Sequence, residues 1–137
     1  RAGQLGADRL RQSSRSIKFW KELSEAQGNP DILIVAAQFG LEHRGKSVRR
    51  AIEVMPANEC GLGAFAVGIM LLTHPNRLQQ FDDLWIDCAD DEYAPAAGGV
   101  FSEAPYFEWR GGGVEFDAGA VDFAFGLYGS VSGFSPQ

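Results

Sequence analysis

Apolar residues are most concentrated from Leu62 to Leu72, where nine of eleven residues are apolar and none is charged. The pattern fits a strand as well as a helix, because alternate residues and residues three or four apart are both apolar. Ala, Leu and Met favour a helix, with Asn58 as N-cap and Pro75 as stop. We predict a buried helix that, at eleven residues, is too short to cross a bilayer, which takes about twenty.

The N-terminal third has the periodicity of two amphipathic helices. The first is predicted over Ala7–Gln27, and the second starts at Asn29 and ends at Gly45, so that the two pack as a hairpin. The predicted buried face of the first helix carries Leu10, Ile17, Trp20 and Leu23.

Three further segments fit more than one pattern. Residues 46–55 fit a strand or a short helix capped by Ser47, and helix is preferred. Residues 78–85 have helical spacing, but their end overlaps a strand predicted over Leu84–Cys88. We place the change from helix to strand near Asp83. Residues 117–129 fit a strand or a helix, and helix is again preferred.

The clearest local signal is a β-hairpin. Two alternating runs, 106–110 and 114–117, flank three glycines. The alternation places Phe107 and Trp109 on the side opposite Tyr106 and Glu108.

Length and composition then define the fold class. A chain of 137 residues with 45% hydrophobic content is one folded domain, spanning 1–137. We expect an α+β fold, in which a helical N-terminal half packs on a small antiparallel β-sheet formed by the C-terminal half.

The two halves carry opposite charge. Residues 1–58 hold ten Lys or Arg against six Asp or Glu, and residues 59–137 hold two against twelve. The excess acid disfavours nucleic acid and anionic membrane surfaces as partners. Two interpretations stand: the charges cancel within the molecule, or they steer pairing with another molecule or copy.

The cysteines and the N-terminus indicate a cytoplasmic protein. Cys60 and Cys88 are too few for a disulfide framework, and the first six residues lack the apolar core of a secretion signal. Cys60 near a helix N-terminus is a candidate nucleophile only if His43 serves as its base.

A dense acidic segment provides the candidate metal ligands. Of the six carboxylates between Asp82 and Glu92, the metal candidates are Asp87, Asp90, Asp91 and Glu92. Oxygen ligands at this density suit Ca²⁺ or Mg²⁺, although the spacing is not that of an EF-hand. The same carboxylates could form a general acid and base pair, and no other cofactor is expected.

Residues 61–66 match the loose dinucleotide pattern GxGxxA. We do not expect nucleotide binding, because residues 56–60 do not read as the strand that should precede this pattern.

Aromatic residues crowd the final third, and some must remain outside the core. The candidate ligand or interface residues are Tyr106, Trp109, Phe123 and Tyr128. Acidic residues around such a patch favour a cationic or amine ligand.

Two functions are therefore carried forward. The first is a non-enzymatic binding or assembly protein, homo-oligomeric or bound to a protein partner or small molecule through its aromatic third. The alternative is a small metal-assisted or acid-base hydrolase centred on Asp82–Glu92.

Overall fold

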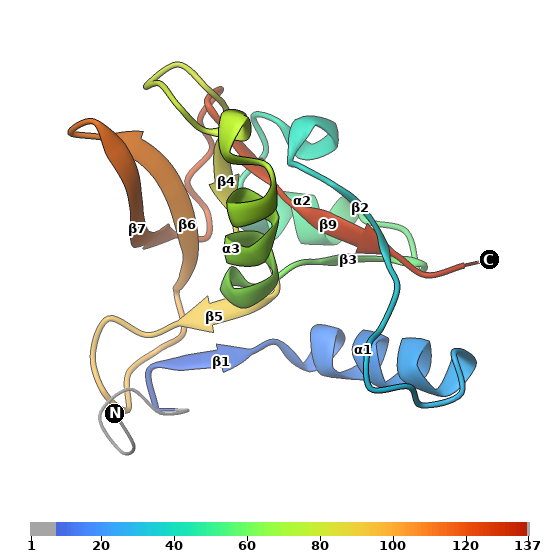
Figure 1. The fold of residues 1–137 in the computed structure, drawn as a ribbon. Helices are drawn as coiled ribbons and strands as arrows, with labels where there is room; N and C mark the ends of the chain where they lie inside the picture. The colour runs from blue at the N-terminus through green and yellow to red at the C-terminus, as the bar shows by residue number, and fades with distance from the viewer. Residues whose placement is uncertain (1–7, 137) are drawn as a thin grey trace.

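A computed structural model describes residues 8–136, which combine helices with two β-sheets (Figure 1). The prediction about a secretion signal concerns residues outside this range. The helices are α1 (Ser14–Ala26), α2 (Val48–Val54) and α3 (Ala64–Thr73), with 3₁₀ turns η1 (Leu41–His43) and η2 (Pro75–Arg77).

Sheet A has six strands and is mixed. Its strand order is β1-β5-β6-β4-β8, and β7 pairs with β6. The β4–β8 pair is parallel and the other pairs are antiparallel. The strands are β1 (Leu10–Gln12), β4 (Trp85–Asp87), β5 (Asp91–Tyr93), β6 (Glu103–Arg110), β7 (Gly113–Ala120) and β8 (Tyr128–Ser130).

Sheet B has three antiparallel strands in the order β2-β9-β3, so the C-terminal strand lies at its centre. The strands are β2 (Ala36–Gln38), β3 (Glu59–Gly61) and β9 (Ser132–Phe134). Because β8 and β9 are separated by a single residue, the last segment of the chain joins the two sheets.

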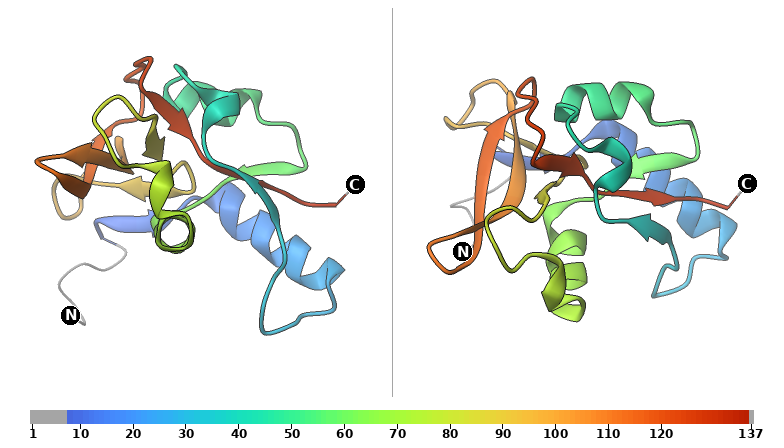
Figure 2. Two further views of the ribbon diagram at one scale, coloured as in Figure 1. Left: turned by 45° about the horizontal axis from the view of Figure 1, so that its top comes forward. Right: turned by 90° about the horizontal axis from the view of Figure 1, so that it is seen from above.

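Helices α3 and α2 lie on opposite sides of the strands (Figure 2, right). Val67 and Leu71 of α3 belong to the main core with Ile86 of β4. Val48 of α2 packs on the other side with Ala104 of β6. Helix α1 runs beside β3 (Figure 1) and packs through Phe19 and Leu23 against Cys60.

The fold mixes helices and strands as predicted, but the division into a helical half and a small antiparallel sheet is wrong. The first 61 residues also contribute β1, β2 and β3, and sheet A is larger than expected and mixed. Each of those three strands pairs with a partner from beyond residue 90, which local periodicity does not reveal.

The predicted helix over 29–45 is absent. Asn29 adopts a left-handed backbone (φ 54°), Ile32 and Ile34 are exposed, and the chain becomes extended at β2. Residues 36–38 pair with β9 instead of forming helical hydrogen bonds, and residues 41–43 form only the 3₁₀ turn η1.

The first predicted helix is shorter and rotated. It begins after Ser13, whose side chain accepts a hydrogen bond from the Ser16 N–H. Phe19 and Leu23 are buried, whereas Ile17 is exposed and Leu10 lies on β1 instead.

The predictions of α3, α2 and the β6–β7 hairpin are confirmed. Helix α3 covers most of the predicted run, and Ser47 caps α2. Strands β6 and β7 pair along their whole length, and Gly111 and Gly112 have positive φ in the turn. The strand predicted over Leu84–Cys88 is β4.

Two other predictions fail in the second half. The segment 117–129 is not a helix: β7 continues to Ala120, a turn follows, and β8 begins at Tyr128. The segment between η2 and β4 is irregular rather than helical.

Ion pairs connect the basic and acidic parts of the chain. Arg11 Nε lies 2.7 Å from Glu92 Oε2, and Arg49 Nε lies 2.9 Å from Asp122 Oδ1. Part of the charge asymmetry is therefore compensated inside the molecule.

Candidate functional site

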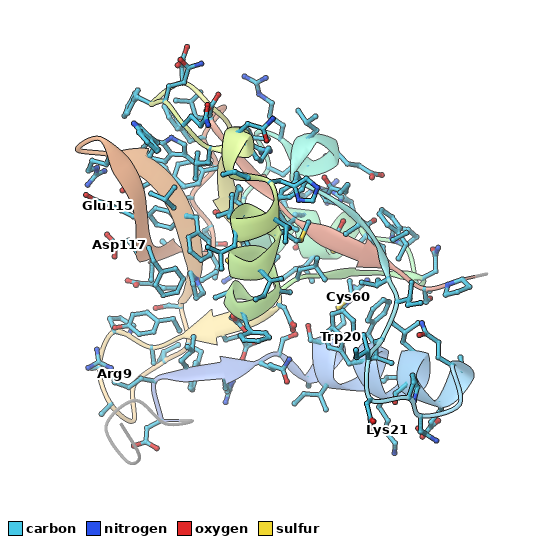
Figure 3. The ribbon with its side chains drawn as sticks, in the orientation of Figure 1. Arg9, Trp20, Lys21, Cys60, Glu115 and Asp117 are labelled. Atoms are coloured by element: carbon cyan, nitrogen blue, oxygen red, sulfur yellow. The ribbon has the colours of Figure 1, made fainter. Side chains whose placement is uncertain are left out.

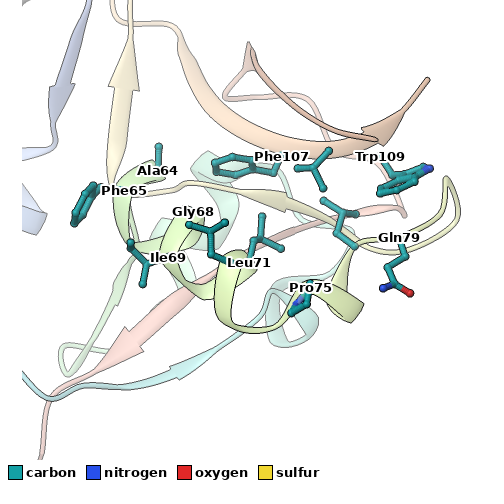
Figure 4. A pocket seen from close by; sticks show the side chains of 12 residues that line it. Ala64, Phe65, Gly68, Ile69, Leu71, Pro75, Gln79, Phe107 and Trp109 are labelled. Atoms are coloured by element: carbon teal, nitrogen blue, oxygen red, sulfur yellow. The ribbon is translucent and has the colours of Figure 1, made fainter. Parts of the chain in front are cut away.

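An apolar groove separates α3 from the β6–β7 hairpin (Figure 4). Its volume is about 890 Å³, within the range of ligand-sized sites. One wall is α3, and the other carries Phe107, Trp109 and Val114. Gln79 is the only polar residue among the twelve that line it, so the groove suits apolar surface.

Helix α3 is apolar on both of its sides, and this creates the groove. Val67 and Leu71 are buried in the core, but Phe65 is 85% exposed and Leu72 79% exposed. A Cβ at Gly68 would meet only Phe107 Cζ, at 3.9 Å, so the groove is open between them. A helix that exposes an apolar side is typical of an interaction surface.

Trp109, one of the predicted interface residues, lies in this groove rather than with the other three. It pairs across the hairpin with Val114, as Phe107 pairs with Phe116. The predicted alternation of β6 is thus confirmed: Phe107 and Trp109 face the groove, and Tyr106 faces the opposite side.

A second cavity, of about 290 Å³, lies on that opposite face of sheet A. Strand register places Asp87 beside Tyr106, and alternation along β8 puts Tyr128 on the same face. Phe123 from the β7–β8 turn and Val48 from α2 complete the walls. Three of the four predicted aromatic residues therefore meet at one cavity, together with a carboxylate.

The aromatic rings around this cavity pack edge to face. The Tyr106 and Tyr128 ring centroids are 5.3 Å apart with planes at 79°, and those of Phe123 and Tyr128 are 6.1 Å apart at 88°. Trp85 supports Tyr128 from a centroid distance of 5.0 Å. These contacts hold the cavity walls in place.

Asp87 is the charged group of the cavity. It is 7% exposed, and desolvation is the only influence found on its carboxylate, with no hydrogen-bond donor or cation among residues 8–136. Burial raises the pKa of Asp87 to about 7, because the anion has lost water without gaining a donor. Burial is also the main cause that raises the pKa of Tyr106 and that of Tyr128.

Further acidic groups share this face of the sheet. Glu108 and Asp117 each act on Tyr106 through their negative charge, which adds to the increase in its pKa. Glu115 and Asp117 project from the outer side of β7 (Figure 3). Arg110 pairs with Glu108 and offsets part of this negative charge, so three carboxylates, those of Glu108, Glu115 and Asp117, stand against one cation on this part of the face.

The other predicted metal ligands are engaged elsewhere. Asp90 Oδ2 accepts hydrogen bonds from Trp20 Nε1 at 3.2 Å and from Gln12 Nε2 at 3.4 Å. Asp91 Oδ2 accepts the Ala64 N–H at 2.7 Å, at the start of α3. Burial raises the pKa of Asp90 to about 6 and also raises that of Asp91.

These carboxylates do not converge as a metal site would require. Glu92 pairs with Arg11 at the surface, whereas Asp90 and Asp91 line a cavity separate from that of Asp87. Across residues 8–136, no three His, Cys, Asp or Glu side chains are grouped so that they could hold a metal ion. The geometry therefore gives the Ca²⁺ or Mg²⁺ hypothesis no support.

A buried polar network was not predicted. His43 Nε2 lies 2.7 Å from Glu59 Oε1, the Ser132 hydroxyl donates to the same oxygen, and Gln38 Nε2 donates to Ser132 Oγ at 2.8 Å. The four residues are brought together by η1 and sheet B, and no sequence spacing connects them. Because His43, Glu59 and Ser132 are almost fully buried, we interpret the network as part of the core.

Cys60 lacks the surroundings of a nucleophile. Its Sγ lies 3.4 Å from Ser16 Oγ, while His43 bonds Glu59 instead. Burial raises the pKa of the Cys60 thiol, which is the opposite of activation. Figure 3 shows Cys60 beside Trp20, between β3 and α1.

The glycine pattern at 61–66 does follow a strand and open a helix, contrary to our expectation. However, β3 belongs to an antiparallel sheet, and the first N–H of α3 is already bonded to Asp91. A phosphate at that position would meet a carboxylate, so nucleotide binding remains disfavoured.

Comparison with known proteins gives no identification: no protein-family model, curated protein or solved structure matches this chain significantly. None of the helices within 8–136 combines the length and apolar character needed to cross a membrane.

Proposed function

We propose that this chain is an assembly protein that forms a two-fold dimer through the groove and the outer side of α3. The observation that carries the proposal is the combination of an apolar groove with two almost fully exposed apolar side chains, Phe65 and Leu72, on one of its walls. Water at such a surface is released when a second apolar surface covers it.

A second copy fits because the surface is self-complementary. Phe65 and Leu72 are seven residues apart, about 10.5 Å along the helix, and Gly68 and Ile69 lie midway between them. A two-fold axis at that midpoint brings Phe65 of one copy against Leu72 of the other, twice. Gly68 then allows the two helices to approach closely.

The exposed apolar area is of the order that a dimer interface buries. A standard interface buries about 800 Å² per partner, about a tenth of the 8028 Å² surface of this protein. At 150–250 Å² for a buried aromatic side chain, the exposed apolar groups offer on the order of 600 Å² before backbone is counted. Those groups are Phe65, Ile69, Leu72 and Val114, which line the groove, and Phe116, which lies outside its lining on the adjoining part of β7.

Substitution of Phe65 by Glu tests the dimer. We expect the wild-type protein to sediment as a dimer at micromolar concentration and the Phe65→Glu variant as a monomer with an unchanged circular dichroism spectrum. Loss of one buried side chain, worth about 1.5–3 kcal/mol, occurs twice across the two-fold axis and is enough to dissociate a micromolar complex. Because the groove is uncharged, added salt should not weaken the dimer.

Ile32 provides the matched control. It is 79% exposed, like Leu72, but lies outside the groove. Ile32→Lys should leave the dimer intact, whereas Leu72→Lys should dissociate it. A wild-type monomer at 200 µM, or equal effects of the Ile32 and Leu72 substitutions, would refute the proposed dimer.

A further inference from the structure

We infer that the cavity between β4, β6 and β8 binds a small organic ammonium ion, with Asp87 as its counter-ion and the rings of Tyr106, Phe123 and Tyr128 as its walls. This site lies on the face of sheet A away from the groove and does not depend on the proposed dimer.

The unpartnered carboxylate is the first argument. Asp87 is more than nine-tenths buried and lines the cavity, yet among the described residues no donor or cation reaches its side chain. A buried carboxylate is costly unless it is paired, so a cation in the cavity would supply the missing partner.

The aromatic walls are the second argument. Faces of Tyr and Phe rings attract cations, and an organic ammonium ion also gains from apolar contact with them. Val48 and Ala120 add apolar surface to the lining. An inorganic ion would not use these contacts, and a neutral ligand would not use Asp87.

The size of the cavity limits the ligand. At about 290 Å³ it corresponds to roughly ten water molecules of 30 Å³ each, which accommodates an ammonium ion with a few carbon atoms. One carboxylate inside the cavity matches a single positive charge.

Binding should depend on pH through Asp87. The titratable groups near it are Tyr106 and Tyr128 on the neighbouring strands and Cys88, the residue that follows β4. Glu108 and Asp117 lie further along the same face. The pKa of each tyrosine and of Cys88 is raised by burial, so these three stay neutral at pH 8. Asp87, with a pKa of about 7, becomes charged between pH 5.5 and 8.

Calorimetric titration with choline and propylammonium tests the inference. We expect at least one of them to bind the wild-type protein at pH 8 and to bind at least tenfold more weakly at pH 5.5. For choline, the neutral isostere 3,3-dimethylbutan-1-ol should bind at least tenfold more weakly. Asp87→Asn should weaken ammonium binding at least tenfold and remove its pH dependence.

Two variants serve as controls. Asp83→Asn changes a nearby carboxylate outside the cavity and should bind like wild type. Phe65→Glu, on the other face, should also bind like wild type whether or not it alters assembly. Equal binding of choline and its neutral isostere, undiminished binding by Asp87→Asn, or no heat with either ammonium ion at 20 mM would overturn the inference.

Discussion

Asp87 illustrates how the fold changes the chemistry of a single residue. An exposed aspartate titrates near pH 4, but burial raises the pKa of Asp87 to about 7. Between those values the folded protein binds a proton that the unfolded chain does not. The stability contributed by this group is therefore complete at low pH and is lost as the pH rises through about 7.

We predict that Asp87→Asn stabilises the protein more at pH 8 than at pH 5.5. The wild-type protein loses about 2 kcal/mol over this range through Asp87, which the neutral amide avoids. Urea denaturation at the two pH values measures the difference. A stability difference between variant and wild type that does not change with pH would contradict a raised pKa.

Asp83 shows the opposite pH dependence of stability, because its pKa is lowered rather than raised. Its carboxylate accepts the Gln79 and Gln80 backbone N–H groups, and the Gln79 bond is the main cause that lowers its pKa. The stability that the Asp83 carboxylate contributes is complete at pH 5.5 and at pH 8. It is lost only as the pH falls through the lowered pKa of Asp83. Asp83→Asn should therefore destabilise the protein equally at pH 5.5 and pH 8.

Helix α3 shows how an element depends on residues outside it. Its N-cap position is Gly63, which offers no side chain, and Asn58, the predicted cap, lies before β3. Asp91 from β5 takes this role by accepting the Ala64 N–H, and its charge also suits the positive end of the helix. A side chain at Gly63 would crowd this carboxylate, since its Cβ would lie 2.9 Å from Asp91 Oδ1.

We predict that Asp91→Ala lowers the free energy of unfolding by about 1 kcal/mol, the usual value of an N-cap. Urea denaturation in a Leu72→Lys background, at the opposite end of α3 from Asp91, measures the loss without a contribution from dimerisation. Asp82→Ala, at an exposed carboxylate, should change stability little. Equal effects of the two substitutions would refute the capping role.

The two sheets are held together where the chain crosses itself at two glycines. Gly40, before η1, packs directly against Gly129 of β8, and a Cβ at Gly40 would lie 2.6 Å from the Gly129 carbonyl oxygen. Gly40 also has a φ of 94°, which disfavours other residues. Neighbouring backbone cannot move aside, because Gly45 N–H donates to Tyr128 O and β8 is paired with β4.

We predict that Gly129→Ala lowers the free energy of unfolding by about 3 kcal/mol, because its Cβ would overlap the Gly40 carbonyl oxygen. Gly113→Ala is the control, since its Cβ would meet nothing within 4 Å and should change stability by less than about 1 kcal/mol. Thermal unfolding of the three proteins tests the prediction. A Gly129→Ala protein as stable as wild type would show that the crossing can relax.

Local sequence patterns were sufficient where an element depends on residues close to it in the chain. The apolar run of α3, the Ser47 cap of α2 and the glycine turn between β6 and β7 are examples. The same patterns selected Tyr106, Phe123 and Tyr128, although not the fact that they surround Asp87.

The elements that the sequence did not predict depend on pairing between strands that are far apart in the chain. Ala36 is extended because it pairs with Phe134, and Tyr128 because it pairs with Trp85, although both lie in segments with helical periodicity. Likewise, the pKa of Asp87 depends on burial between strands that are distant in the chain. Backbone hydrogen bonds and desolvation depend on neighbours in space, which periodicity along the chain does not specify.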